Sequence, residues 1–532
     1  MSRSVAAERG PAPRAAAASG ERSAVPPWDG VHLPAGVYLW GLASCAILGA
    51  ALRAAHLDRP FNRLMAWNEG HYAMTALNFD RYGLWSPHNE LGADRTFSPG
   101  VPWMIWASFK TFGPTEWAAR LPIVLCGIAA VVLVAVLVRR LLRSEQIGLI
   151  VGTFAAVAPG LVYFSQNVQL DTPSICAALA GAVCMVRYRD ERRPSDFIGA
   201  GAFLTLAIWF KFTAAVLYPV FLWWWWPARP RYALRAAAAF VAVTILPSAA
   251  WIATRWFASD AGGEFFHRDW TPVGVVKALS EIPLSVEAHL FVPLFLLLLG
   301  GLAVAARWRA HLVWIWLWCA PWLATYVIAP WDSLTNRYYD LPATYVLLTL
   351  AALALWRTRL PRVRGPSWTL GSVAAGLAVA LSLTVAYDLW DPTGDRLARA
   401  AMPHSAAIDP VAFYSARLVA ALPPGRAIVD TPQTMFYAGG DPRWIDYTGG
   451  DVRWKIDGEL YDYIVLNDYG HGQEPYYAID GALRAELARH GYVQIAPALW
   501  AHVRTRIADL GGYRSPNVPP GAPWRWTGHT KP

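Results

Sequence analysis

Long apolar runs are the feature of this sequence that most constrains its fold. Residues 119–138 contain a single charged residue, and residues 367–387 contain none. A helix of about 20 mostly apolar residues is long enough to cross the hydrocarbon core of a bilayer. The whole chain agrees, because only 16% of its residues are charged, against about 25% in soluble proteins. The sequence therefore excludes a disordered chain, a coiled coil and an ordinary cytosolic enzyme, and it predicts a polytopic membrane protein.

The pattern of apolar runs predicts eleven membrane-spanning helices. The tail before them, residues 1–34, is rich in Ala, Arg, Ser and Pro and is expected to be disordered and cytoplasmic. The predicted spans lie at about 35–55, 119–139, 147–165, 171–187, 197–211, 213–227, 235–257, 289–306, 312–330, 338–356 and 367–388.

Arginine clusters between the spans set the predicted orientation, because basic loops stay on the cytoplasmic side. Residues 100–113 are apolar but too short to cross a membrane. If they lie in the outer interface, five arginine clusters fall on the same side as the N-terminal tail. Loops 56–118 and 258–288 and the tail after 388 then face outside. The positive net charge of +9 reflects these arginine clusters. The sequence shows no basic groove with interleaved aromatic residues, so it does not indicate nucleic-acid binding.

Residues 389–532 differ in character from the rest and are expected to form a small extracytoplasmic α/β domain. Short β-type runs at 427–431, 461–468 and 492–503 alternate with helical patterns at 410–422 and 480–490. No glycine-rich phosphate loop follows any of these runs, so nothing here indicates nucleotide binding.

Four ionisable residues are predicted at the outer membrane face. Glu69 lies in the loop motif WNEGHYAM, Asp171 at the mouth of a span, Lys211 between two apolar runs, and Arg337 just before a late span. Each has a structural explanation when taken alone: a solvated loop acid, a helix cap or a snorkelling base. Together, two carboxylates and two cations suit group transfer from an anionic phosphate. Such a transfer needs a base for the acceptor and cations for the leaving group.

The order of these motifs resembles the C-type (GT-C) glycosyltransferases, in particular the protein O-mannosyltransferases and the lipid A aminoarabinose transferases. An acidic loop motif is followed by the apolar segment SPGVPWMIWASFKTFG and by a span that opens with Arg-Leu-Pro. Asp-Thr-Pro, a Lys after a short span and Arg-Tyr-Tyr before a late span come next. The resemblance covers about residues 35–390. It implies a mainly α fold, a polytopic membrane helix bundle of about 11 transmembrane helices, in the cytoplasmic membrane, with its active site outside.

The resemblance also implies roles for individual residues. Asn68 stands where the family has the first acid of an Asp-Glu pair, so the catalytic role falls to Glu69 or Asp171, or this chain is inactive. The expected catalytic residues are Glu69 and Asp171; the donor phosphate would be bound by Lys211, Arg337, Tyr338 and Arg95, and the substrate by Asn68, His71 and Tyr72.

The implied reaction moves a monosaccharide from a polyprenyl-phosphate donor to an acceptor by a single inverting displacement. The acceptor class stays open between glycan, lipid and protein, and membrane lipids surround the enzyme. A divalent metal bridging acid and phosphate is also left open, although no His/carboxylate spacing requires one. Two alternatives are a polytopic lipid or sugar transporter or flippase, and an inactive scaffold of the same fold. A transporter would favour charges near the bilayer midplane and internal repeats, and the sequence shows neither.

Overall fold

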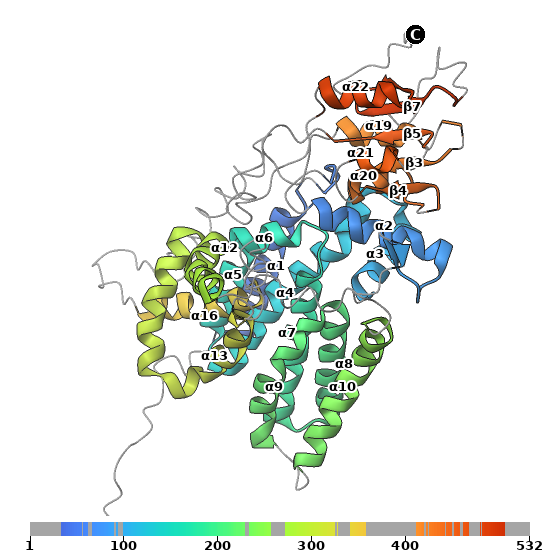
Figure 1. The fold of residues 1–532 in the computed structure, drawn as a ribbon. Helices are drawn as coiled ribbons and strands as arrows, with labels where there is room; N and C mark the ends of the chain where they lie inside the picture. The colour runs from blue at the N-terminus through green and yellow to red at the C-terminus, as the bar shows by residue number, and fades with distance from the viewer. Residues whose placement is uncertain are drawn as a thin grey trace, which may run out of the picture.

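The protein is a helical bundle with a small α/β unit at one end, as seen in a computed structural model (Figure 1). The structure describes residues 33–55, 57–61, 66–89, 92–93, 99–228, 233–256, 272–324, 327, 341–357, 411–419, 422–423, 425–441, 443–448, 452–457, 461–467, 479 and 481–505. All statements below concern these residues.

The first half of the bundle is built from helices that each begin at a recognisable signal. α4 (Glu116–Leu142) starts after Thr115, whose side chain accepts a hydrogen bond from the Ala118 amide. α5 (Glu145–Val157) starts after Ser144, which caps the Ile147 amide in the same way. These helices pack with α1 (Ala35–Arg53) and α7 (Asp171–Glu191).

One predicted span is bent. α5 and α6 (Pro159–Ser165) form a pair bent by 60°. Pro159 has no amide hydrogen, so the carbonyl of Ala155 loses its helical partner. The guanidinium of Arg53 donates to that carbonyl at 3.0 Å and to the carbonyl of Ala156 at 2.9 Å. The arginine at the end of α1 therefore caps the broken helix.

Two helix pairs organise the second half of the bundle. α8 (Pro194–Phe210) packs on α7, and α12 (Pro272–Arg307) packs on α16 (Leu341–Arg357). The further elements are η1 (Phe212–Leu217), α9 (Tyr218–Trp225), η2 (Trp226–Ala228), α10 (Ala233–Trp256) and α13 (Arg309–Leu323).

Three described helices are long and apolar enough to cross a membrane: Ala35–Arg53, Glu116–Leu142 and His289–Arg307, and the bent pair makes a fourth. Five shorter apolar helices fall at other predicted spans. The last predicted span, 367–388, lies outside the described residues, so the count of eleven stays a prediction. The described part of the expected loop 258–288 is helical, because α12 already begins at Pro272. Beyond this loop, the positive φ of Phe291 (59°) interrupts the same helix.

Two helices lie between α1 and α4, in the loop that the sequence predicts to face outside. α2 (Ala66–Tyr82) carries the acidic motif, and α3 (Gly100–Phe112) is the short apolar segment that the sequence predicts. Strands β1 (His88–Asn89) and β2 (Gly92–Ala93) form a small hairpin between them. Trp103 of α3 stacks on Trp209 at the end of α8, with ring centroids 5.2 Å apart.

The C-terminal unit is a five-stranded sheet with the order β4-β3-β5-β7-β6. Strands β4, β3 and β5 are parallel, while β7 and β6 are antiparallel to their neighbours. The expected runs at 427–431 and 461–468 each contain one strand, the run at 492–503 forms two antiparallel strands where one was expected, and helices lie within the expected ranges 410–422 and 480–490. The elements are α19 (Val411–Val419), β3 (Ala427–Val429), α20 (Pro432–Tyr437), β4 (Ile445–Tyr447), α21 (Arg453–Ile456), β5 (Tyr463–Val465), α22 (Gly481–Arg489), β6 (Tyr492–Ala496) and β7 (Leu499–His502).

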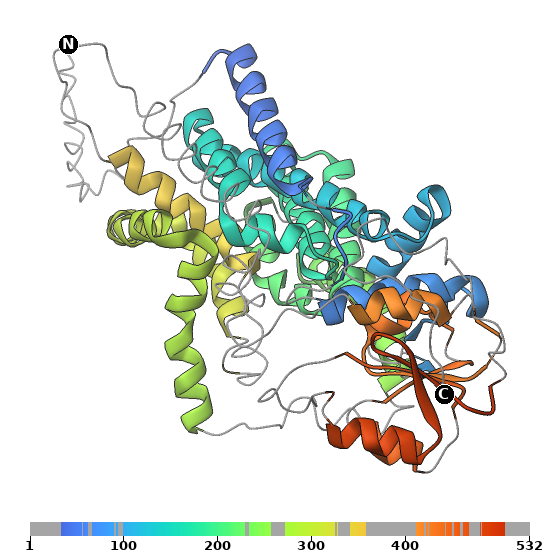
Figure 2. The same ribbon diagram turned by 90° about the horizontal axis from the view of Figure 1, so that it is seen from above.

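The α/β unit sits directly on the helix that carries the acidic motif. Helix α20 lies beside α2 in both views (Figures 1 and 2). Gly70 makes this approach possible, since a Cβ atom there would lie 2.6 Å from the backbone nitrogen of Gln433. Tyr437 and Arg417 both donate to the carboxylate of Glu116 at the start of α4, at 3.0 and 2.8 Å. The C-terminal unit thus contacts both the loop helix and the bundle.

Candidate active site

Glu69 of α2 is held in a buried ion pair with Arg120 of α4. Arg120 Nε donates to Glu69 Oε1 at 2.7 Å, and its Nη2 donates to Oε2 at 2.9 Å. Both side chains are fully buried. Arg120 belongs to the Arg-Leu-Pro motif, yet sequence reasoning gave it no role. A fork-shaped, two-bond contact of this kind fixes orientation as well as charge.

Arg120 also anchors the segment that directly follows α1. Its guanidinium donates to the backbone carbonyls of Leu57 and Arg59 and lies 4.9 Å from the centre of the Phe61 ring. All the donor directions of the guanidinium therefore point at Glu69 or at the loop backbone. The pair joins α2, α4 and the segment that follows α1.

Asp171 and Lys211 form a second buried ion pair. Lys211 Nζ donates to Asp171 Oδ1 at 2.7 Å, and the two side chains are 10% and 4% exposed. Asp171 is the first residue of α7, and Lys211 is the extended residue at which α8 ends and η1 begins. The Lys211 side chain therefore points to the N-terminus of α7. It does not snorkel outward to the membrane surface.

The two carboxylates approach the same short segment between α6 and α7. Glu69 Oε1 accepts a hydrogen bond from the Val168 amide at 3.1 Å, three residues before Asp171. Side chains of this segment are themselves fixed: Gln166 donates to the Leu52 carbonyl and Gln169 to the Phe164 carbonyl. Glu69 therefore contacts the segment that leads into Asp171, although the two carboxylates have different partners.

The remaining predicted residues fall into two groups. Asn68 is half-buried, while His71 and Tyr72 are buried on α2 with their rings in edge contact, 5.1 Å between centroids. Arg95, Arg337 and Tyr338 lie outside the described residues, so their expected contact with a donor phosphate stays a prediction.

Arg53 is a buried cation that the sequence reasoning missed. It is fully buried, binds backbone carbonyls of α1 and α5, and pairs with no carboxylate among the described residues. Gly127 leaves room for it, because a Cβ atom there would lie 3.2 Å from Arg53 Nε. The carbonyl end of a helix attracts positive charge, which gives Arg53 a structural role at the bend. Two features of the sequence could have indicated this role: an arginine at the end of one predicted span and a proline, Pro159, inside another.

A buried polar cluster supports the helix that rests on α2. Asp430 follows β3 and Asn467 follows β5, and the Asn467 amide donates to Asp430 Oδ2 at 2.6 Å. The Asn467 side chain donates to Asp430 Oδ1 at 2.6 Å and to Thr434 Oγ1 at 2.8 Å. Thr431 caps α20 through the Thr434 amide. Burial raises the pKa of the Asp430 carboxyl to about 7, although the Asn467 donors act in the opposite direction.

We expect the stability of this unit to depend on pH through Asp430. Because the folded pKa is about 7 and the unfolded value about 3.9, the folded state binds the proton more tightly. The stabilisation is fully present below about pH 4 and is lost as the pH rises through about 7, by at most about 4 kcal/mol. Thermal unfolding of wild type and Asp430→Asn from pH 4 to 8 measures this. The difference between the two should change with pH over this window, and a constant difference would contradict the assignment.

Comparison with known proteins supports the fold. The family model described as dolichyl-phosphate-mannose-protein mannosyltransferase matches residues 95–252. The crystal structure of ArnT from Cupriavidus metallidurans bound to undecaprenyl phosphate is 16% identical and has a TM-score of 0.55. The match covers 88% of this chain and 98% of that chain. The apo structure of the same protein matches at 17% identity and the same TM-score, over 85% of this chain and 94% of that chain.

A second solved structure has the same architecture. AglB, an archaeal oligosaccharyltransferase from Archaeoglobus fulgidus in complex with an inhibitory peptide and a dolichol-phosphate, is 11% identical with a TM-score of 0.50. It covers 81% of this chain and 69% of that chain. No curated protein sequence matches the chain. ArnT and AglB are GT-C enzymes, so the expected fold is confirmed: a mainly helical GT-C-type membrane protein with a small sheet near its C-terminus.

Proposed function

We propose that this protein is a glycosyltransferase that takes a monosaccharide from a polyprenyl-phosphate donor. The observation that carries the proposal is the Asp171–Lys211 pair, a buried carboxylate and cation 2.7 Å apart at helix ends. The fold it shares with ArnT, whose structure holds undecaprenyl phosphate, and the matched mannosyltransferase family model support the donor class. The sugar and the acceptor follow from neither.

We assign the base to Asp171. Its carboxylate would take the proton of the acceptor hydroxyl as that oxygen attacks the anomeric carbon. The bond from that carbon to the phosphate oxygen breaks at the same time, and its electron pair leaves with the lipid phosphate. Lys211, held in place by Asp171, would stabilise the developing phosphate charge as a preorganised cation. A single displacement of this kind inverts the anomeric configuration.

We assign a positioning role to Glu69. Arg120 and the Val168 amide donate to its two oxygens, and the side chain is fully buried. A carboxylate so enclosed is poorly placed to meet an acceptor hydroxyl. It would instead fix α2, so that the half-buried Asn68 and the buried His71 and Tyr72 face the substrate space. With Asn at position 68, the reaction depends on Asp171 alone for its base.

Arg337 and Tyr338 complete the proposed donor site. An arginine stays charged when partly desolvated, and its planar fork can bind two phosphate oxygens. Arg95 would be a third cation for the same phosphate. The active site and the C-terminal unit would face outside the cytoplasmic membrane, with the N-terminus in the cytoplasm.

Purified protein incubated with radiolabelled polyprenyl-phosphate sugar tests this function. We expect bound lipid, and release of unlabelled lipid phosphate as the sugar moves to acceptor in a membrane extract. Translocation of intact donor across proteoliposomes would instead support a flippase. Bound lipid without any transfer would identify an inactive scaffold.

Labelling of single cysteines tests the orientation. A cysteine placed at exposed Trp85 of the first outer loop or at exposed Trp444 of the C-terminal unit should react with an impermeant thiol reagent added from outside. A cysteine at exposed Arg193, in a predicted cytoplasmic cluster, is the control and should react only after the membrane is opened. The reverse pattern would contradict the orientation and the site placement with it.

A further inference from the structure

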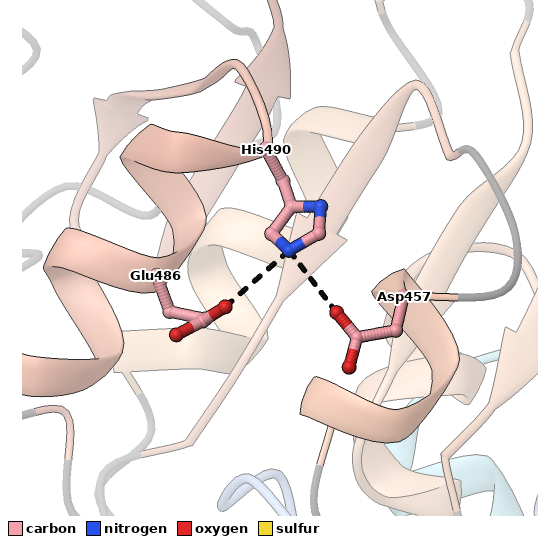
Figure 3. Close-up of side chains that lie close together, drawn as sticks. All are labelled: Asp457, Glu486 and His490. Carbon is pink, nitrogen blue, oxygen red and sulfur yellow. Dashed lines mark ion pairs between the residues drawn. The ribbon is translucent and has the colours of Figure 1, made fainter.

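Three metal-ligating side chains meet in the C-terminal unit. Glu486 lies in the last turn of α22, His490 directly follows that helix, and Asp457 directly follows α21 (Figure 3). His490 Nε2 lies 3.1 Å from Asp457 Oδ1 and 3.3 Å from Glu486 Oε1. One ligand atom from each residue lies within 4.8 Å of the other two.

A simple ion pair explains this arrangement poorly. Figure 3 shows both carboxylates directed at the same ring nitrogen. One Nε2–H can make a straight hydrogen bond to only one of them at a time. Two carboxylate oxygens brought this close to one nitrogen suit a shared divalent cation, which binds all three atoms at once.

The distances also fit the coordination shell of zinc. In a tetrahedral site with bonds of about 2.0–2.1 Å, neighbouring ligand atoms are about 3.3 Å apart. The two measured separations, 3.1 and 3.3 Å, are close to that value. Zn²⁺ accepts His nitrogen and carboxylate oxygen as ligands, and its catalytic sites combine three protein ligands with an open fourth position. The side chains of Asp457, His490 and Glu486 are 64%, 31% and 21% exposed, so an ion and its water can enter.

We propose that Asp457, Glu486 and His490 bind a divalent transition-metal ion, with Zn²⁺ the best fit. The site ties α21 to α22, which pack against the face of the sheet opposite to the one that α20 covers. It is therefore a structural or regulatory site of the outer unit, and it is independent of the proposed glycosyl transfer.

Zinc titration of the full-length protein tests the site. The protein is purified in detergent without a polyhistidine tag, stripped with a chelator, and titrated with ZnCl₂ in a calorimeter. We expect wild type to bind one more Zn²⁺ than His490→Gln, and Asp457→Asn and Glu486→Gln to weaken this binding at least about 10-fold. Asp446→Asn, which changes a carboxylate of β4 outside the cluster, is the matched control and should bind as wild type does.

Cobalt gives a second readout of the same site. Bound Co²⁺ should show the visible absorption of a tetrahedral site in wild type and in Asp446→Asn, but not in His490→Gln. Zinc should also raise the Tm of wild type and leave that of His490→Gln unchanged. Equal zinc binding by wild type and all three cluster variants would overturn the proposal and leave the cluster as an ion pair.

Discussion

Asp171→Asn should abolish sugar transfer while leaving the protein folded in the membrane. The substitution keeps the size of the side chain but removes the base and leaves Lys211, now 2.7 Å from an amide, without its partner. Loss of the general base should lower the rate of transfer by about 10²–10⁴-fold, and the broken ion pair should lower the stability separately. Initial rates with a radiolabelled polyprenyl-phosphate sugar measure the effect.

A buried carboxylate at the other end of the same helices is the control. Asp196 at the start of α8 is 7% exposed and pairs with Arg187 of α7 at 3.4 Å. Asp196→Asn also removes a charge from a partly buried pair, and we expect it to keep transfer within a fewfold of wild type. If Asp171→Asn and Asp196→Asn transfer equally well, Asp171 is only a helix-end residue and the base lies elsewhere.

Glu69→Gln should have the largest effect on stability. Glu69 neutralises Arg120 in a fully buried pair, so the variant leaves an uncompensated charge inside the protein. Breaking one partner of a buried pair costs about 3–5 kcal/mol. Thermal unfolding in detergent should show a marked loss of Tm, and transfer should fall because α2 is no longer fixed.

The double variant separates positioning from catalysis. Glu69→Gln with Arg120→Met removes both charges, so its loss of stability should be smaller than the sum of the single losses. If Glu69 only positions α2, the double variant should also recover part of the transfer that Glu69→Gln loses. Glu145→Gln, in the partly exposed pair with Arg139 at 2.9 Å, should cost little. A double variant as inactive as Glu69→Gln but fully stable would point to Glu69 as the base.

The sequence was sufficient to predict the helical regions and the loop that carries the acidic motif. Apolar runs dominate the helical regions, and a run of about 20 apolar residues has few alternatives to a membrane helix. It also placed Glu69, Asp171 and Lys211 among the residues to examine. The short elements α20 and β4 were missed, because six and three residues carry too little periodicity to be recognised.

Partners could not be predicted, because they are set by tertiary packing. Glu69 pairs with Arg120, 51 positions away, and Lys211 pairs with Asp171, 40 positions away. The sequence grouped Glu69 and Lys211 at one membrane face, but it did not show that both side chains are buried. Nothing local in the sequence shows that Gly70 admits Gln433 of a distant unit. The sequence placed Arg53 only at the end of a span. Its contacts with the carbonyls of Ala155 and Ala156 depend on the break of the helix at Pro159.

A cryo-electron microscopy structure of the protein with a polyprenyl phosphate tests the proposed roles of Lys211 and Asp171. We expect the phosphate within hydrogen-bonding distance of Lys211 Nζ, with the Asp171 carboxylate facing the space where the anomeric carbon would sit. We also expect the Glu69–Arg120 pair to stay intact. A phosphate bound away from Lys211, with the Asp171–Lys211 pair unchanged, would contradict these roles.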